Sequence, residues 1–343
     1  MILHDEPMSR HVSWRAGGPA RRACAPRDID DLQDFLRGLP ASEPVLFVGL
    51  GSNLLVRDGG YPGTVVLMHH AHAAARVEGD EIFASARLAS PKLARFAANE
   101  GLKGSEFLAG VPGTVGGALA MNAGCYGSET WDAVTRVQTI DRHGTLRVRS
   151  RSEYDIGYRR CVLRGAGPVS SEADDGGDAA APGEWFTGAW FRFARGSAAA
   201  ARMHIRDLLA RRVASQPLNL PNAGSVFRNP PQDFAARLIE SCGLKGFGIG
   251  GARVSEKHAN FIVNPGGRGS AADIEALIVH VQRVVFELRG VELIREVRIV
   301  GEPPAGAGEA ERSDAAEDDS GQRNEPGAAG WFDARQEARR RQA

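Results

Sequence analysis

The chain has no excess of positive or negative charge, and no two of its cysteines stand at a spacing typical of metal or redox motifs. Lys and Arg together number 42, as do Asp and Glu, so no long-range field attracts a nucleic acid or an anionic membrane. The four cysteines show no C-x-x-C spacing, which argues against a zinc site and against a disulfide framework. We therefore expect no nucleic-acid partner, no membrane partner and a reduced, cytoplasmic location.

Long apolar runs are also missing. Residues 1–15 mix charges and histidines, so we expect neither a signal peptide nor a membrane span. With 343 residues and 43% hydrophobic content, the chain can build two or three domains with cores of their own. Low hydrophobicity predicts a mobile surface loop over 165–183 and a disordered tail over 302–343.

Periodicity and punctuation predict a mixture of helices and strands. The expected helices cover 28–37, 90–100, 197–214, 233–242 and 270–289. The expected strands cover 45–48, 64–68, 134–140, 146–148, 185–193 and 291–300, the third and fourth as a hairpin. Ser90 is the expected cap of the second helix, and the last helix begins with a Ser270–Asp273 capping pair and ends before Gly290.

Glycine, in contrast, is abundant, with 42 residues, and it concentrates in two loops. The second glycine loop (110–124) is the richer of the two, and the first glycine loop (49–53) follows an apolar run. Glycines leave backbone amides uncovered, and such loops bind phosphates and flat rings. Two loops of this kind indicate a dinucleotide.

The two loops differ in how specific they are. The first has a G-x-G pattern without a third glycine and without a following helix, so it fits neither the Rossmann fingerprint nor the P-loop. Taken alone, it is read most simply as a turn that ends a strand. The second carries so many glycines that a purely structural role is the weaker interpretation, since each glycine adds to the entropy lost on folding.

A series of blocks along the chain resembles the UDP-N-acetylenolpyruvoylglucosamine reductase family, flavoproteins of bacterial peptidoglycan synthesis. The blocks are 15–20, 49–55, 110–127, 158–159, 224–230, 254–264 and 296–301. Each alone is weak, but their order and spacing are specific, and together they span nearly all of 12–301. Trp14, Arg228 and Cys161 depart from the residues commonest in the family at these positions.

The resemblance implies an α+β fold, with a two-lobed FAD-binding domain of the PCMH and vanillyl-alcohol oxidase type and a C-terminal α/β substrate-binding domain. The implied boundaries are 1–70 for the first FAD-binding lobe, 71–196 for the second, 197–301 for the substrate-binding domain and 302–343 for the tail.

The resemblance also assigns site residues. The implied FAD contacts are Gly49, Leu50, Gly51, Ser52, Asn53, Leu54, Val111, Pro112, Gly113, Thr114, Gly116, Gly117, Asn122, Ala123, Gly124 and Arg298. The implied substrate contacts are Tyr158, Arg228, Asn229 and His258. No metal is assigned, because His69, His70 and His72 have no flanking carboxylate or cysteine at ligand spacing.

Three residues carry the implied chemistry. Arg159 would hold the substrate carboxylate with its guanidinium, Glu296 would share a proton or hydrogen bond with that carboxylate, and Ser225 would donate a proton. Without the family, Arg159 reads as half of a solvated basic pair and Ser225 as a turn serine. Glu296 then reads as a solvated residue, opposite the apolar face of the strand expected over 291–300.

The implied reaction is the NADPH-dependent, FAD-mediated reduction of UDP-N-acetylglucosamine enolpyruvate to UDP-N-acetylmuramate, by a monomer. Its partners would be that nucleotide sugar and NADPH. Two alternatives stay open on the sequence. One is an FAD-dependent oxidase of the same broad superfamily, and the other is a nucleotide-sugar binding module that has lost its flavin.

Overall fold

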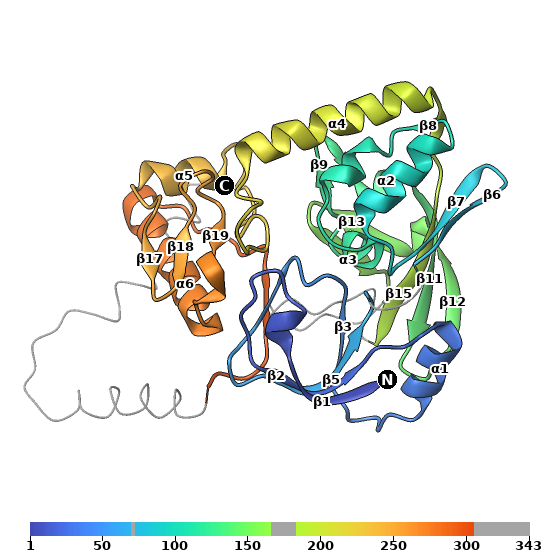
Figure 1. Cartoon of the computed structure of the whole chain (residues 1–343), viewed down its shortest axis with the longest axis horizontal. Helices are drawn as coiled ribbons and strands as arrows, with labels where there is room; N and C mark the ends of the chain where they lie inside the picture. The colour runs from blue at the N-terminus through green and yellow to red at the C-terminus, as the bar shows by residue number, and fades with distance from the viewer. Residues whose placement is uncertain (70–72, 166–182, 305–343) are drawn as a thin grey trace, which may run out of the picture.

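The computed structural model describes residues 1–69, 73–165 and 183–304. His70, His72, the interior of the loop expected over 165–183 and the tail beyond residue 304 lie outside this part. The chain forms two lobes and a C-terminal unit. Helix α4 (Ala198–Ser215) runs along one edge of the molecule and connects the second lobe to the C-terminal unit (Figure 1). Within the described part, no helix is long and apolar enough to cross a membrane.

The first lobe is built on a four-stranded sheet in the order β1-β2-β5-β3. Its strands are β1 (Ile2–Pro7), β2 (Pro19–Cys24), β3 (Val45–Val48) and β5 (Tyr61–Leu67). β1 and β2 pair antiparallel, whereas β5 runs parallel to both β2 and β3. Helix α1 (Ile29–Arg37) connects β2 to β3, with Asp28 accepting a hydrogen bond from the amide of Asp31 at its start.

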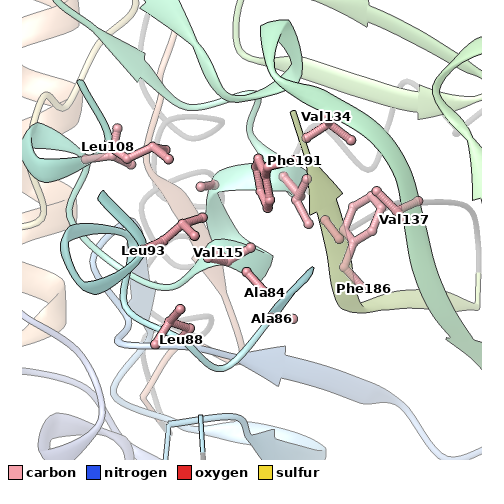
Figure 2. Packing of buried hydrophobic residues seen from close by; sticks show 14 of the residues in the cluster. Ala84, Ala86, Leu88, Leu93, Leu108, Val115, Val134, Val137, Phe186 and Phe191 are labelled. Carbon is pink, nitrogen blue, oxygen red and sulfur yellow. The ribbon is translucent and has the colours of Figure 1, made fainter. Parts of the chain in front are cut away.

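The second lobe contains an antiparallel five-stranded sheet in the order β12-β11-β15-β7-β6. The strands are β6 (Ala75–Glu78), β7 (Glu81–Ser85), β11 (Val134–Asp141), β12 (Leu146–Ser150) and β15 (Glu184–Phe191). Helices α2 (Ser90–Asn99) and α3 (Val115–Ala120) share its core. Figure 2 shows Leu93 and Leu108 on one side of Val115, and Phe186 and Phe191 of β15 on the other.

The C-terminal unit packs helices α5 (Ala235–Ser241) and α6 (Ala271–Arg289) with a small sheet. Its strands are β17 (Gly248–Ile249), β18 (Ala252–Val254) and β19 (Ile262–Val263), all antiparallel. The chain then returns to the first lobe, because β20 (Arg298–Val300) pairs in parallel with β4 (Leu54–Val56).

Short elements complete the chain. The remaining strands form three pairs: β8 (Leu102–Lys103) with β16 (Ala194–Arg195), β9 (Gly124–Cys125) with β10 (Ser128–Glu129), and β13 (Tyr154–Gly157) with β14 (Arg160–Leu163). The 3-10 helices are η1 (Met8–Arg10), η2 (Glu106–Gly110), η3 (Thr130–Asp132), η4 (Arg151–Glu153) and η5 (Pro265–Gly267).

All five expected helices are present, but one cap and one strand differ from expectation. Ser90 is the first residue of α2 rather than its cap, and its buried hydroxyl has no hydrogen-bond partner within residues 1–69, 73–165 and 183–304. The strand expected over 291–300 is regular only in β20. Before it, the amides of Glu296 and Arg228 donate to the carbonyls of Val226 and Ile294, which is an irregular pairing that a two-residue alternation cannot reveal.

The division into 1–70, 71–196 and 197–301 stays a prediction, and packing crosses two of its boundaries. Ala201 and Ile205 of α4 belong to the core of the second lobe, although they follow residue 196. Trp14 and Leu55 of the first lobe belong to the core of the C-terminal unit.

Candidate active site

A cavity of about 300 Å³ lies where the two lobes and the C-terminal unit meet. Both glycine loops line it, together with Arg159, Ser225 and Glu296. These three side chains come from the turn after β13, from the segment before α5 and from the segment before β20. Arg159 and Glu296 therefore share one cavity although 137 positions (296 − 159) separate them in the sequence.

The first glycine loop offers unpaired backbone donors. Among the described residues, no acceptor pairs with the amides of Leu50, Gly51, Ser52 and Asn53. Gly51 has a φ of +57°, and a Cβ there would lie 2.2 Å from the carbonyl oxygen of His11. Glycine is thus required here by the backbone conformation and by close packing, and the amides it leaves uncovered suit an anion.

The second glycine loop touches the first. A Cβ at Gly49 would lie 2.4 Å from Thr114 Oγ1, and one at Gly113 would lie 2.6 Å from Ser52 Oγ. Its amides are less bare than the glycine content predicts, since those of Val115 and Gly116 donate to the carbonyls of Leu88 and Ala86. This loop therefore contributes shape and a smooth wall more than hydrogen-bond donors.

Arg159 and Glu296 form an ion pair at the edge of the cavity. Arg159 Nε lies 2.7 Å from Glu296 Oε1, and the two side chains are 16% and 12% exposed. Arg159 has a φ of +52°, unusual for a residue with a side chain. Backbone strain of this kind is often found where a side chain must be aimed at a site.

Burial is the main influence on the Glu296 carboxyl. It raises the pKa of Glu296, and the guanidiniums of Arg159 and Arg228 oppose that rise. The raised pKa favours the protonated form of the carboxyl, which suits a group that shares a proton with a bound carboxylate.

Two asparagines fix the segments that carry Ser225 and Glu296. Asn260 is buried, its Oδ1 accepts from the amide of Phe227 at 3.0 Å, and its Nδ2 donates to the carbonyl of Phe227 at 2.8 Å. Asn53 Nδ2 donates to the carbonyl of Glu296 at 3.0 Å. Asn53 therefore supports the backbone of Glu296 with its side chain, while its own backbone N–H stays unpaired among the described residues.

Of the sixteen expected FAD contacts, two do not line this cavity. Asn122 is buried, and its side chain donates to Glu129 and to the carbonyl of Gly157 and accepts from the amide of Trp131. Its place is thus in the support of the loop. Gly116 instead lines a neighbouring cavity of about 60 Å³, together with Trp185 and Phe186.

The four expected substrate contacts also lie outside the lining of the main cavity. Asn229 is exposed, and its Oδ1 accepts from the amide of Ala235 at the start of α5. Tyr158 is 49% exposed. The guanidinium carbon Cζ of Arg159 lies over the Tyr158 ring, 5.3 Å from the ring centroid. His258 packs edge-on against Phe261, and burial lowers the pKa of its imidazole.

Arg228 has a clearer link to the site. Its charge lowers the pKa of Glu296, and its buried Nε has no hydrogen-bond partner among the described residues. An unpaired buried donor beside a carboxyl is consistent with a ligand contact.

Several lining residues escaped the sequence analysis. The cavity is also lined by Arg212 of α4, by Gln216 directly after α4, and by Met121, Cys125 and Phe261. An arginine on a helix surface ordinarily reads as solvated, so only the packing of α4 against η2 reveals Arg212. Burial raises the pKa of Cys125 to about 11, which keeps it a neutral thiol.

The arrangement fits a dinucleotide better than a compact ligand. The main and smaller cavities adjoin, since both are lined by Phe47, Gly49 and Gly117, and the smaller one adds the aromatic residues Trp185 and Phe186 of β15. Rings fit the apolar walls, and a diphosphate fits the amides. No metal centre is seen, since no three His, Cys, Asp or Glu side chains gather within the described ranges.

Comparisons with known proteins identify the same two parts of the chain. Residues 216–300 match the family model for the C-terminal domain of UDP-N-acetylenolpyruvoylglucosamine reductase, and residues 20–149 match a FAD binding domain. The UDP-N-acetylenolpyruvoylglucosamine reductase of Nitrosospira multiformis is 58% identical over 310 residues, which cover 88% of this chain and 89% of the relative. That of Thiobacillus denitrificans is 56% identical over 315 residues, covering 88% and 92%.

A solved structure is similar as well. The crystal structure of UDP-N-acetylenolpyruvylglucosamine reductase from Thermus caldophilus superposes with a TM-score of 0.69 at 29% identity. The match covers 87% of this chain and 98% of the other. It supports the α+β architecture of a FAD-binding domain followed by a C-terminal domain.

Proposed function

The chain belongs to the UDP-N-acetylenolpyruvoylglucosamine reductase family, and from that premise we propose how its cavity performs the reaction. The protein is a flavin-dependent oxidoreductase that reduces UDP-N-acetylglucosamine enolpyruvate in peptidoglycan synthesis. Its cofactor is FAD. The identities of the site residues, NADPH as the reductant, a monomeric state and a cytoplasmic location are parts of the proposal.

The two glycine loops hold the FAD. The uncovered amides of Leu50, Gly51, Ser52 and Asn53 support contact with its diphosphate, and the smooth wall around Gly113 and Gly117 supports contact with its rings. When bound, FAD supplies the hydride chemistry between NADPH and the vinyl carbon of the substrate. The protein supplies orientation and charge.

Arg159 and Glu296 act on the substrate carboxylate. The guanidinium of Arg159 offers a planar fork of donors to that carboxylate and offsets charge that develops on it in the transition state. Glu296, whose pKa is raised by burial, shares a proton or a hydrogen bond with the same group. The ion pair between the two residues keeps both aimed at one point before substrate arrives.

Ser225 delivers the proton to the carbon adjacent to the site of hydride addition. Gly224, with a φ of +76°, precedes it, and the bonds of Asn260 to Phe227 fix the segment that follows. A serine hydroxyl is a weak acid, so a strongly basic carbanion must receive the proton. Tyr158, Arg228, Asn229 and His258 are retained as contacts for the remainder of the substrate, with support from the unpaired Nε of Arg228.

The observation that carries the proposal is the presence of Arg159, Ser225 and Glu296 in one cavity with both glycine loops. A visible absorbance spectrum tests it. The purified protein is expected to be yellow, to bleach with NADPH under nitrogen, and to regain its colour when the enolpyruvyl substrate is added without oxygen. Recovery of the colour only with oxygen would indicate an oxidase. A colourless protein that stays colourless after FAD is added would indicate a binding module.

A further inference from the structure

A buried side chain, Asn122, joins the second glycine loop to the turn that carries Arg159. That turn consists of Tyr158 and Arg159 and connects β13 to β14, a hairpin that lies beside α3 (Figure 1). Asn122 follows α3 in the sequence and is 1% exposed. Its Nδ2 donates to the carbonyl of Gly157, the last residue of β13, at 3.0 Å. The glycine loop therefore holds the backbone two residues before Arg159.

The other contacts of Asn122 fix the orientation of its amide. Nδ2 also donates to Glu129 Oε2 at 2.7 Å, and Oδ1 accepts from the backbone amide of Trp131 at 3.2 Å. A rotated side-chain amide would place its oxygen against the Glu129 carboxylate and the Gly157 carbonyl, both of which are acceptors. Glu129 therefore orients Asn122, and the hydrogen bond to Gly157 follows from that orientation.

The backbone conformation at both ends of this link is unusual. Asn122 has a φ of +41°, in the left-handed region that asparagine tolerates better than most residues. Arg159 has a φ of +52°. Arginine has no such tolerance, so surrounding contacts must hold the turn in this conformation. The bond from Asn122 to Gly157 is one such contact, and a second is the bond from Arg159 Nη2 to the carbonyl of Gly124 at 3.4 Å.

The position of Arg159 matters because its partner Glu296 comes from the C-terminal unit. Arg159 Nε lies 2.7 Å from Glu296 Oε1, and a misplacement of about 1 Å in a reacting group can slow a reaction about a hundredfold. On the side of Glu296, Asn53 Nδ2 donates to the Glu296 carbonyl at 3.0 Å. Asn122 gives the corresponding support on the side of Arg159.

We propose that Asn122, oriented by Glu129, is a positioning residue that places the Arg159 guanidinium where the substrate carboxylate binds. This inference rests on the proposed function, because that function assigns Arg159 to the carboxylate. It gives Asn122 a role different from the FAD contact that the family resemblance implies, and Asn122 is not among the residues that line the main cavity. Asn122 acts through Arg159 and not on the flavin.

Stopped-flow absorbance on the FAD-loaded protein tests the proposal. Asn122→Asp keeps the size of the side chain and its tolerance of a left-handed backbone. It replaces the donor with an acceptor that faces the Glu129 carboxylate and the Gly157 carbonyl. Reoxidation of the reduced protein by the enolpyruvyl substrate is expected to slow by about tenfold to a hundredfold, while FAD affinity and reduction by NADPH stay unchanged.

The matched control is Gln33→Glu, which makes the same change at another hairpin. Gln33 Nε2 donates to the carbonyl of Gly144, in the turn between β11 and β12, at 2.7 Å. Gln33 lines neither the main nor the smaller cavity. Gln33→Glu should lower stability without slowing either flavin step, which separates loss of a turn contact in general from loss of the contact that serves Arg159.

A double-mutant cycle shows whether the effect passes through Arg159. In the Arg159→Met background, Asn122→Asp should not slow the residual reoxidation further, because the guanidinium that Asn122 positions is gone. Equal slowing in both backgrounds would overturn the proposal, and so would equal slowing of reduction and reoxidation, or wild-type reoxidation in Asn122→Asp. If Asn122→Asp does not fold, Asn122→Gly decides, since glycine accepts a φ of +41° and removes the same hydrogen bond.

Failure of this inference is distinguishable from failure of the proposed function. If the enolpyruvyl substrate does not reoxidise the wild-type protein, the proposed function fails, and urea unfolding of Asn122→Gly across a pH series still tests the position of Arg159. A displaced Arg159 opposes the raised pKa of Glu296 less, so the pH-dependent loss of stability should extend to higher pH than in the wild type. Identical pH profiles for the two proteins would overturn the inference.

Discussion

At the residue scale, the most informative group is Glu296, whose ionisation is set by two opposing influences. Burial raises its pKa, and Arg159 and Arg228 pull it down. A raised pKa means that the folded state holds the proton more tightly than the unfolded state. The resulting stability is therefore fully present below the ordinary glutamate pKa and is lost as the pH rises through the raised value.

Arg159→Met is expected to raise the pKa of Glu296 further, because it removes the cation that lies 2.7 Å from the carboxylate. The pH-dependent loss of stability should then extend to higher pH than in the wild type. Urea unfolding across a pH series measures it. The control is Arg159→Met combined with Glu296→Gln, in which this extension should vanish, and identical pH profiles for wild type and Arg159→Met would contradict the prediction.

Ser225 allows the two halves of the reaction to be separated. Ser225→Ala should retain FAD and its reduction by NADPH, since the hydroxyl is proposed only as the proton donor to substrate. Reoxidation by the enolpyruvyl substrate should slow by about a hundredfold or more, the usual range for a lost general acid. Stopped-flow absorbance follows both steps, and unchanged reoxidation would remove Ser225 from the mechanism.

At the scale of elements, α6 shows how local signals define a helix completely. Ser270 Oγ accepts from the amide of Asp273, and the Asp273 side chain accepts from the amide of Ser270. Asp58 of the first lobe accepts from the amides of Ala271 and Ala272. Gly290, with a φ of +66°, ends the helix in the left-handed conformation.

Ser270→Ala should lower the free energy of unfolding by about 0.5–2 kcal/mol, because it leaves the amide of Asp273 without its cap. Chemical denaturation measures the change. Ser215→Ala near the end of α4 is the matched control, because that hydroxyl bonds only to helix carbonyls, and its effect should stay within about 0.5 kcal/mol. Equal losses in the two variants would show that Asp58 alone suffices to cap α6.

Elements defined by distant partners were harder to predict than α6. β4 and β20 are three residues each and pair across more than 240 positions, so neither carries a periodic signal of its own. Glu296 illustrates the consequence. The alternation of the strand places Glu296 on the face opposite Val297 and Ile299, and both of these residues are buried. The face that carries Glu296, however, lines a cavity and does not face open solvent.

At the scale of the whole molecule, the resemblance to a family carried more of the site than the residues did. Glycine content alone indicates a dinucleotide, but it says nothing of Arg159, Ser225 and Glu296, which meet only because the second lobe and the C-terminal unit converge. The glycine content also predicts more unpaired backbone amides in the second glycine loop than the structure has, because the amides of Val115 and Gly116 donate to the carbonyls of Leu88 and Ala86. Neither the glycine pattern nor the family resemblance indicates Arg212, because its place in the cavity depends on the packing of α4 against η2.

Trp14 joins the first lobe to the C-terminal unit, and we call this contact the joint. Its ring is fully buried in the core of the C-terminal unit, and its Nε1 donates to the carbonyl of Ile262 at 2.8 Å. Asn264 Nδ2 donates in turn to the carbonyl of Trp14. A phenylalanine, which is commoner in the family at this position, would fill much of the space without making the bond to Ile262.

Trp14→Phe should therefore lower the free energy of unfolding by about 1–3 kcal/mol, since it leaves a buried carbonyl unpaired, and it should weaken FAD binding because the joint positions the cavity wall. Urea denaturation and flavin fluorescence titration measure the two effects. Trp190→Phe is the matched control: the Nε1 of Trp190 donates to Glu78, a carboxylate that water can reach, and that residue lies far from the joint, in β15. We expect a smaller loss of stability and unchanged FAD affinity in the control. If both variants keep wild-type FAD affinity, the joint around Trp14 supports the fold without shaping the site.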